Sequence, residues 1–88
     1  MIYEAYLRLR VEASAGMRVQ RCAHQMVWLS RQLNLIVECT FNDVELIAYP
    51  MHVSGDALAE AYNQAVQGEL GPEMGKTRYA FSDGKHVP

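Results

Sequence analysis

The sequence contains few cysteines and none of the spacings that build a disulfide framework or a zinc site. Its two cysteines, Cys22 and Cys39, form no CxxC pair and stand apart from any group of histidines. Cys22 and His24 are separated by one residue, so on a helix they point in nearly opposite directions and cannot share a metal ion. We therefore expect both cysteines to act as small buried hydrophobic residues, and we expect no metal and no cofactor.

Long apolar runs are missing as well, and no stretch approaches the length of a membrane-spanning helix. Residues Met1 to Ala5 lack the basic start and apolar run of a secretory signal. We therefore expect a cytoplasmic protein that has no membrane partner. The formal net charge of -2 provides no general attraction to nucleic acid, so only a local basic patch would serve that purpose.

What is present is an ordinary globular composition, with 50% apolar and 20% charged residues in a chain of 88. A chain of this length has room for one hydrophobic core and therefore for one domain. Glycine and proline gather after Gly68, where the hydrophobicity falls. We expect a single domain over 1–70 and a tail over 71–88, with a short strand near 77–81.

A β-hairpin is predicted in the middle of the chain. Residues 35–41 and 44–49 flank Asn42-Asp43, a short linker whose side chains tolerate the positive φ of a type I′ turn. Pairing residue 41 with 44, 39 with 46 and 37 with 48 places the apolar residues on one face. This register is the one that a half-buried sheet requires.

A strand and two helices surround the hairpin. Alternation over 3–11 predicts a first strand, and helical spacing predicts a helix from Val19 to Asn34. A second helix begins at Ser54 as its N-cap and ends at Gly68.

The predicted class is α+β, a three- or four-stranded antiparallel sheet with two helices on one face in the order β-α-β-β-α. A strand near 77–81 would complete a ferredoxin-like arrangement. The sheet residues expected to face the helices include Leu7, Leu9, Val37 and Leu46. The helix residues expected to be buried are Val19, Ala23, Met26, Ser30, Leu33, Ala57, Leu58, Ala61, Tyr62, Ala65 and Val66.

The segment from Gly71 to Thr77 ends in Gly-Lys-Thr but does not match a phosphate-binding loop. Gly71 and Gly75 are separated by one residue fewer than the motif requires. The segment also follows a predicted helix rather than a strand. We therefore expect no nucleotide binding there.

The layout of the chain resembles that of acylphosphatases, which carry a Gly-x-Val-Gln-Gly-Val-x-x-Arg loop. Val19 and Gln20 match this loop. Arg21 replaces the second glycine, and Gln25 stands where the phosphate-binding arginine is expected. The asparagine of the family has no counterpart either, since Asn42 falls in the turn. The chemistry lacks both of these parts, so we expect no enzyme activity.

Charge is distributed unevenly between the two predicted helices. From Ala13 to Val37 there is no acidic residue, whereas from Pro50 to Gly75 there is no lysine or arginine. One interpretation is that the helices lie side by side and attract each other weakly. The other is that the first helix presents its basic side to an acidic protein or to a nucleic acid. The cations of this helix region are Arg18, Arg21 and Arg31.

Trp28 does not fit a simple core. At about 100° per residue, it points away from Val19, Met26 and Leu33 and should face solvent. An exposed tryptophan among arginines has the composition of an interface hot spot. The candidate partner-binding residues are Trp28, Arg21, Arg31, His24, Gln25 and Gln32.

Two alternatives to solvent exposure stay open for Trp28. Tyr79 or Phe81 of the tail would cover it, or it would lie along a wide apolar stripe with Val27 and Leu29. Either alternative would make the tryptophan a folding residue rather than a binding residue.

The uncovered face of the predicted sheet is a second candidate surface. It mixes apolar and charged side chains, and its glutamates repel phosphate, which disfavours RNA. A homodimer or another protein contact suits this surface better. Its candidate residues are Tyr6, Arg8, Ile47 and Tyr49.

The small size, the strand-helix-hairpin-helix layout and the lack of catalytic residues resemble small accessory proteins of bacteriophages and mobile elements. The resemblance implies a stoichiometric binder that occupies the surface of a host protein, such as an anti-CRISPR or another inhibitor of a host defence system. We therefore expect a non-catalytic protein-binding role. A nucleic-acid-binding accessory protein is the first alternative, and an acylphosphatase-like enzyme is the second.

Overall fold

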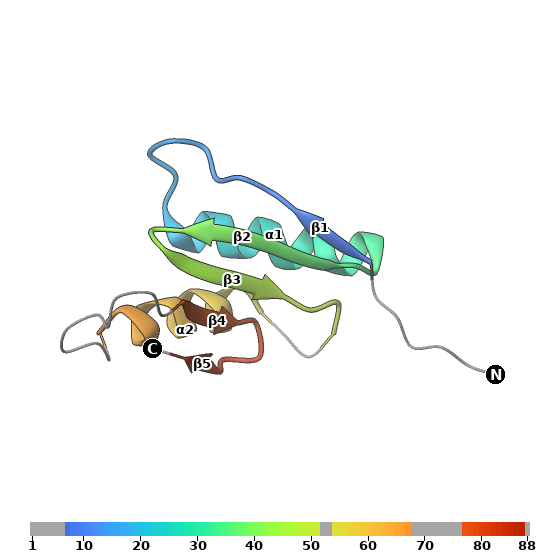
Figure 1. The fold of residues 1–88 in the computed structure, drawn as a ribbon. Coiled ribbons are helices and arrows are strands. Elements are labelled where there is room, and N and C mark those ends of the chain that lie inside the picture. Colours follow the sequence, from blue (N-terminus) through green and yellow to red (C-terminus); the bar gives the residue numbers. More distant parts are fainter. Residues whose placement is uncertain (1–6, 52–53, 68–76, 88) are drawn as a thin grey trace.

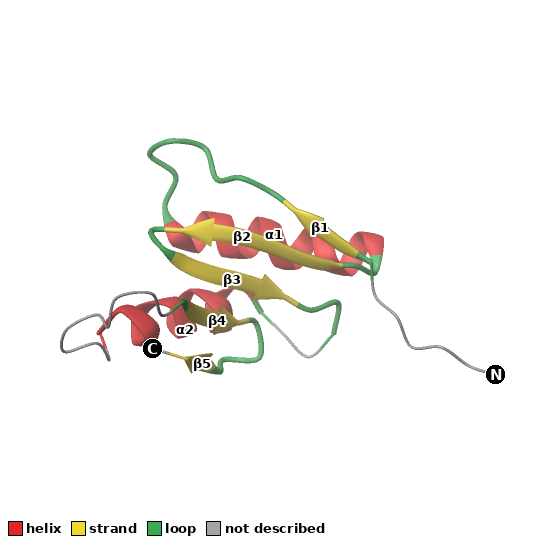
Figure 2. Cartoon of the chain, viewed as in Figure 1, coloured by secondary structure: helices red, strands yellow, loops and turns green. Residues whose placement is uncertain are grey.

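A five-stranded sheet and two helices form the computed structural model, which describes residues 7–51, 54–67 and 77–87. Figure 1 shows both helices on one side of the sheet, and Figure 2 distinguishes helices, strands and connections. The elements are β1 (Arg8–Arg10), α1 (Val19–Leu33), β2 (Ile36–Phe41), β3 (Val44–Ala48), α2 (Gly55–Gln67), β4 (Arg78–Phe81) and β5 (His86–Val87). Predictions for Tyr6, for the start of the first strand, for Gly68 and for most of the Gly-Lys-Thr segment lie outside the described residues.

The α+β class with both helices on one face is confirmed, and the strand predicted near 77–81 is present as β4. The sheet is mixed rather than strictly antiparallel, because β1 pairs with β2 and β3 pairs with β4 in parallel. The strands follow the order β1-β2-β3-β4-β5, so each helix connects two adjacent parallel strands. In a ferredoxin-like sheet another strand lies between the two parallel strands that a helix connects. The strand order therefore differs from the ferredoxin-like arrangement that the sequence suggested.

The β2–β3 hairpin has the predicted register. Phe41 pairs with Val44, and the pairing continues along both strands as the alternation required. Asn42 and Asp43 have φ values of 47° and 67°, the positive angles of a type I′ turn. A second hairpin joins β4 to β5, and its turn contains Gly84 at a φ of 92°, where a side chain would be strained.

Both helices begin or end at residues that the sequence indicated. Asn34 closes α1 in the left-handed conformation, with a φ of 53°. The Ser54 hydroxyl accepts the Ala57 N–H at 3.0 Å and caps the start of α2. Leu33 and Val66 are 51% and 38% exposed, contrary to the predicted stripes, because both lie at the C-terminal ends of their helices.

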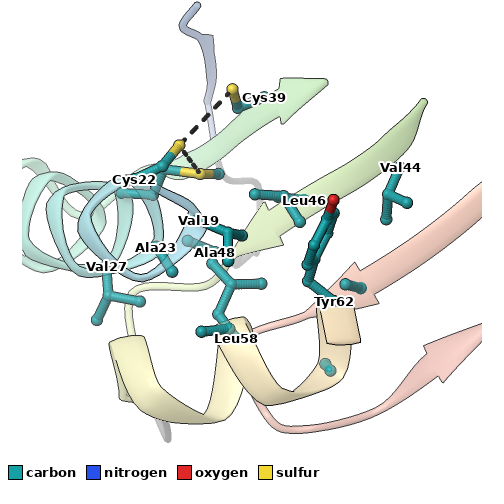
Figure 3. Packing of buried hydrophobic residues seen from close by; sticks show 14 of the residues in the cluster. Val19, Cys22, Ala23, Val27, Cys39, Val44, Leu46, Ala48, Leu58 and Tyr62 are labelled. Carbon is teal, nitrogen blue, oxygen red and sulfur yellow. Dashed lines mark hydrogen bonds between the residues drawn. The ribbon is translucent and has the colours of Figure 1, made fainter. Parts of the chain in front are cut away.

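The hydrophobic core lies between the sheet and the helices, and Figure 3 shows its close packing. Val37 and Leu46 are fully buried as predicted, and Leu9 is half-buried against the same cluster. Leu7 is 74% exposed instead, because it precedes the first residue of β1. The apolar face of the hairpin therefore faces the helices, whereas the apolar pattern of the first strand extends beyond the core.

The two cysteines are buried as predicted, with exposed fractions of 3% for Cys22 and 0% for Cys39. Cys22 lies on α1 and Cys39 on β2, and their thiols face each other across the core. Burial raises the pKa of Cys22 to about 12. Free Cys22 is therefore a thiol rather than a nucleophilic thiolate at neutral pH.

Candidate binding surfaces

α1 is held in one rotation by its inward side. The Ser30 hydroxyl donates to the carbonyl oxygen of Leu35 and, at 3.2 Å, to that of Ala48 on β3. A helix anchored on one side presents a fixed opposite side, so the outward residues of α1 have defined positions. The buried residues of α1 are Val19, Cys22, Ala23, Met26, Val27 and Ser30.

Trp28 lies on the outward side of α1 and is 61% exposed. Tyr79 and Phe81 do not cover it, because they belong to β4, where their rings stack on each other. Val27 is buried and Leu29 is half-buried, so the inward stripe ends beside the tryptophan. The prediction that Trp28 faces solvent is confirmed.

The polar residues predicted around Trp28 are also exposed. The first turn of α1 contains no acidic residue, and Arg31 lies in the last turn, where the helix dipole favours a cation. The result is an exposed aromatic ring with cationic and amide side chains at helical spacing. We call this set the Trp28 surface, which consists of Trp28, Arg21, His24, Gln25, Arg31 and Gln32.

His24 connects the Trp28 surface to α2. Its Nε2 atom lies 2.9 Å from Oδ1 of Asp56, an exposed pair of the kind that contributes little to stability. The two helices approach closely here. A Cβ atom at Gly55 would lie 2.7 Å from the Cα atom of His24, which leaves no room for a side chain. His24 and Asp56 thus form a contact between the two helices at one margin of the surface, whereas the attraction predicted from the arginines of the first helix stays a prediction.

A recess of about 640 Å³ opens beside the Trp28 surface. Arg21 and Gln25 belong to both features, so the recess extends the surface toward the N-terminal end of α1. Guanidinium groups suit the carboxylate or phosphate groups of a partner. The recess is lined by Ser14, Ala15, Gly16, Met17, Arg18, Arg21 and Gln25.

The open face of the sheet, away from the helices, carries a network of opposite charges. Arg10 donates to the two carboxylate oxygens of Glu45, at 3.0 and 2.8 Å, and lies 3.8 Å from Glu38. Arg8 donates to Glu38, and the Thr40 hydroxyl donates to Glu45. The hydrogen bonds from Arg10 are the main reason that the pKa of Glu45 lies below its ordinary value. These arginines and glutamates largely neutralise one another.

Aromatic side chains occupy another part of this face. Phe81 stacks on Tyr49 and on Tyr79, with ring centroids 6.2 and 6.1 Å apart and interplanar angles of 7° and 13°. A groove of about 420 Å³ lies between this stack and the charge network. We call its lining the sheet surface, which consists of Arg8, Glu38, Glu45, Ile47, Tyr49, Tyr79 and Phe81.

The structure brings together three residues predicted for this face, Arg8, Ile47 and Tyr49, while Tyr6 lies outside the described residues. Ile47 is only 6% exposed, so neighbouring side chains cover it even though it lies on the open face of the sheet. Tyr79 and Phe81 were missed, since strand patterns do not state which strands are neighbours. Their alternation with buried small residues was the available signal.

The residues compared with the acylphosphatase pattern lie in a turn and in a helix. The Asn42 amide donates to the Tyr62 hydroxyl at 3.1 Å, and Gln20 lies in the first turn of α1 rather than in a loop. In the part of the chain that the structure describes, no three or more histidine, cysteine, aspartate and glutamate side chains gather as metal ligands. Within the same residues, neither helix is long and apolar enough to cross a membrane.

Comparisons with protein-family models, with curated proteins and with solved structures found no match to this chain. The two surfaces are therefore interpreted from their own geometry and charge.

Proposed function

We propose that this protein is a non-catalytic binding protein that occupies the surface of a protein partner through the Trp28 surface. The observation that carries the proposal is a tryptophan that is 61% exposed on a helix anchored by its opposite side. Tryptophan is among the residues most enriched in interface hot spots. A rigidly held, exposed tryptophan fits binding better than folding.

The energetic argument rests on the ring and on its position. An indole ring buries on the order of 150–250 Å² when a partner covers it, and Trp28 still exposes most of its area. Because α1 is held by Ser30 and by its buried stripe, little conformational freedom of the backbone is lost on binding. A groove on the partner that accepts the indole ring would bury most of this area on binding.

The charge around the ring favours an acidic partner. Arg21 lies about two turns before Trp28 and Arg31 about one turn after it, and α1 contributes no carboxylate. Such complementarity raises the rate of association and selects among partners. The recess beside Arg21 would receive an acidic side chain of the same partner.

The resemblance to phage accessory proteins indicates which partner to test first. A host defence complex, of the kind that anti-CRISPR proteins occupy, is a large protein target for which blocking a surface is sufficient. Blocking a surface needs no catalytic site, so a chain of 88 residues is large enough for the proposed role.

The test is affinity capture from extracts that contain candidate defence complexes, with three forms of the protein. Trp28→Ala removes the ring, and Leu33→Ala is a matched control, because Leu33 is also apolar, on α1 and 51% exposed. We expect the same partner on the wild type and on Leu33→Ala, and little of it on Trp28→Ala. Equal capture by all three would contradict the proposal.

A nucleic-acid-binding role would give a different pattern in the same experiment. The captured material would be nucleic acid, its binding would fall steeply with salt, and each loss of Arg18, Arg21 or Arg31 would reduce the salt slope. The net charge of -2 argues for the protein partner.

A further inference from the structure

The core contains a group of three sulfur atoms that the binding role does not use. Cys22 and Met26 lie one turn apart on α1, and Cys39 lies on β2. The Cys22 Sγ atom is 3.9 Å from Cys39 Sγ and 3.8 Å from Met26 Sδ, and Figure 3 marks both contacts. The side chains are 3%, 0% and 1% exposed for Cys22, Cys39 and Met26. We call Cys22, Met26 and Cys39 the sulfur cluster.

Two of the three sulfur–sulfur distances of the cluster fit a three-coordinate metal ion. Metal–sulfur bonds of about 2.3 Å place the sulfurs of a trigonal site about 4.0 Å apart. The two observed separations, 3.9 and 3.8 Å, are within a few tenths of an ångström of that value. A disulfide would need one of them to shrink by almost half. Two edges of the cluster therefore already have the length that a trigonal site requires, and binding of the ion would bring Met26 Sδ and Cys39 Sγ to the same separation.

The donor set selects the kind of ion. Thiolate and thioether sulfurs are soft ligands, and a site with both favours Cu(I) over ions that prefer oxygen or nitrogen. Structural zinc takes a fourth ligand, and the described residues contain no group of histidine, cysteine and carboxylate side chains that would supply it. The cluster is thus suited to a soft monovalent ion with three sulfur ligands.

We infer that the ion enters past Met17, at the edge of the hydrophobic core that contains the cluster. Met17 is half-buried, packs against the core, and lines both the recess of about 640 Å³ and a second one of about 400 Å³. Its thioether is a soft donor at the boundary between solvent and core. The connection from Val11 to Arg18 contains no helix or strand, so movement there breaks no element.

We propose that the sulfur cluster binds one soft monovalent metal ion of the Cu(I) class. The ion forms bonds to the two cysteine sulfurs and to the Met26 thioether, and the two thiol protons pass to solvent. The ion enters as Cu(I), so nothing is oxidised or reduced.

The test is an anaerobic titration of the full chain with Cu(I) buffered by bathocuproine disulfonate, followed by X-ray absorption at the copper edge. We expect one equivalent bound, three sulfur scatterers, and an affinity that falls about a hundredfold for each unit of pH below 7, because two protons compete. More than one equivalent, or oxygen and nitrogen scatterers, would overturn the proposal.

Variants separate the cluster from non-specific thiol binding. Cys22→Ala should lower the affinity at least a hundredfold. Met26→Leu conserves volume and should fold normally, yet it should lower the affinity about tenfold and leave two sulfur scatterers. Met51→Leu is the control, because Met51 is 52% exposed and outside the cluster. Unchanged affinity in Met26→Leu, with circular dichroism reporting a native fold, would contradict a three-sulfur site.

Discussion

The Trp28 surface and the sheet surface both display aromatic and charged side chains, but they differ in what those side chains already contact. On the sheet surface, Phe81 stacks on Tyr49 and Tyr79. The arginines of the sheet are bound to Glu38 and Glu45. On the Trp28 surface the ring is 61% exposed. The presence of aromatic and charged side chains on a surface therefore does not identify an interface, because those side chains can already be engaged in contacts within the chain.

The sharpest test of this comparison is Trp28→Ala. A truncated hot spot costs about 2 kcal/mol or more of binding, which is roughly a 30-fold loss of affinity. An exposed substitution changes stability by about 0.5 kcal/mol or less, so the melting temperature should move by only a few degrees. Calorimetric binding and thermal unfolding of the same sample check both expectations. A large fall in melting temperature with normal binding would make Trp28 a folding residue.

Phe81→Leu should have the opposite effect. Leucine keeps most of the apolar burial but loses the stacking on Tyr49 and Tyr79, and aromatic pairs contribute about 0.5–1.5 kcal/mol each. We expect a loss of roughly 1–2 kcal/mol in stability, seen as a lower midpoint in urea, and unchanged partner binding. If binding fell as much as in Trp28→Ala, the interface would include the sheet surface.

Charge reversal at Arg21 or Arg31 should weaken partner binding moderately. Each change to glutamate replaces attraction by repulsion toward an acidic partner, which we expect to reduce affinity about five- to tenfold at low salt. The effect should shrink as salt is added. Kinetic binding measurements at several salt concentrations test this, and an effect confined to the dissociation rate at every salt concentration would argue against long-range steering.

The pH dependence of the sheet surface gives the smallest expected effect. The pKa of Glu45 is lowered, mainly by its hydrogen bonds from Arg10, so the stabilisation is present above the unfolded-state pKa and is lost as the pH falls through the folded-state value. We expect Glu45→Gln to show a shallower loss of stability below about pH 4.3 than the wild type. Urea unfolding at several pH values provides the measurement. Parallel curves would show that this pair has no net effect.

Local chemistry made a large part of the fold predictable. The Asn42-Asp43 turn sets the hairpin register, and Ser54 and Asn34 mark helix ends, because each acts through its nearest neighbours in the chain. Helix geometry also predicted that Trp28 points away from the core, although the sequence left open whether Tyr79 or Phe81 would cover it. These features depend on a few consecutive residues, so they can be read without a structure.

The lateral order of the strands could not be read in this way. Up to β4, a split sheet and the observed sheet have the same order of elements along the chain and differ only in which strands are neighbours. Alternation fixes which side chains share a face but not the adjacent strand. The stack of Phe81 on Tyr49, and with it most of the sheet surface, depends on β4 lying beside β3.

The contact between Gly55 and His24 has a consequence for engineering this protein. A methyl group at residue 55 would act as a wedge, since it would meet the His24 backbone at 2.7 Å and not merely a rotatable ring. Its relief would require α1 to swing or slide relative to α2, carrying the indole of Trp28 to a new approach angle. A substitution at residue 55, which is buried, would therefore change how a partner docks on the Trp28 surface.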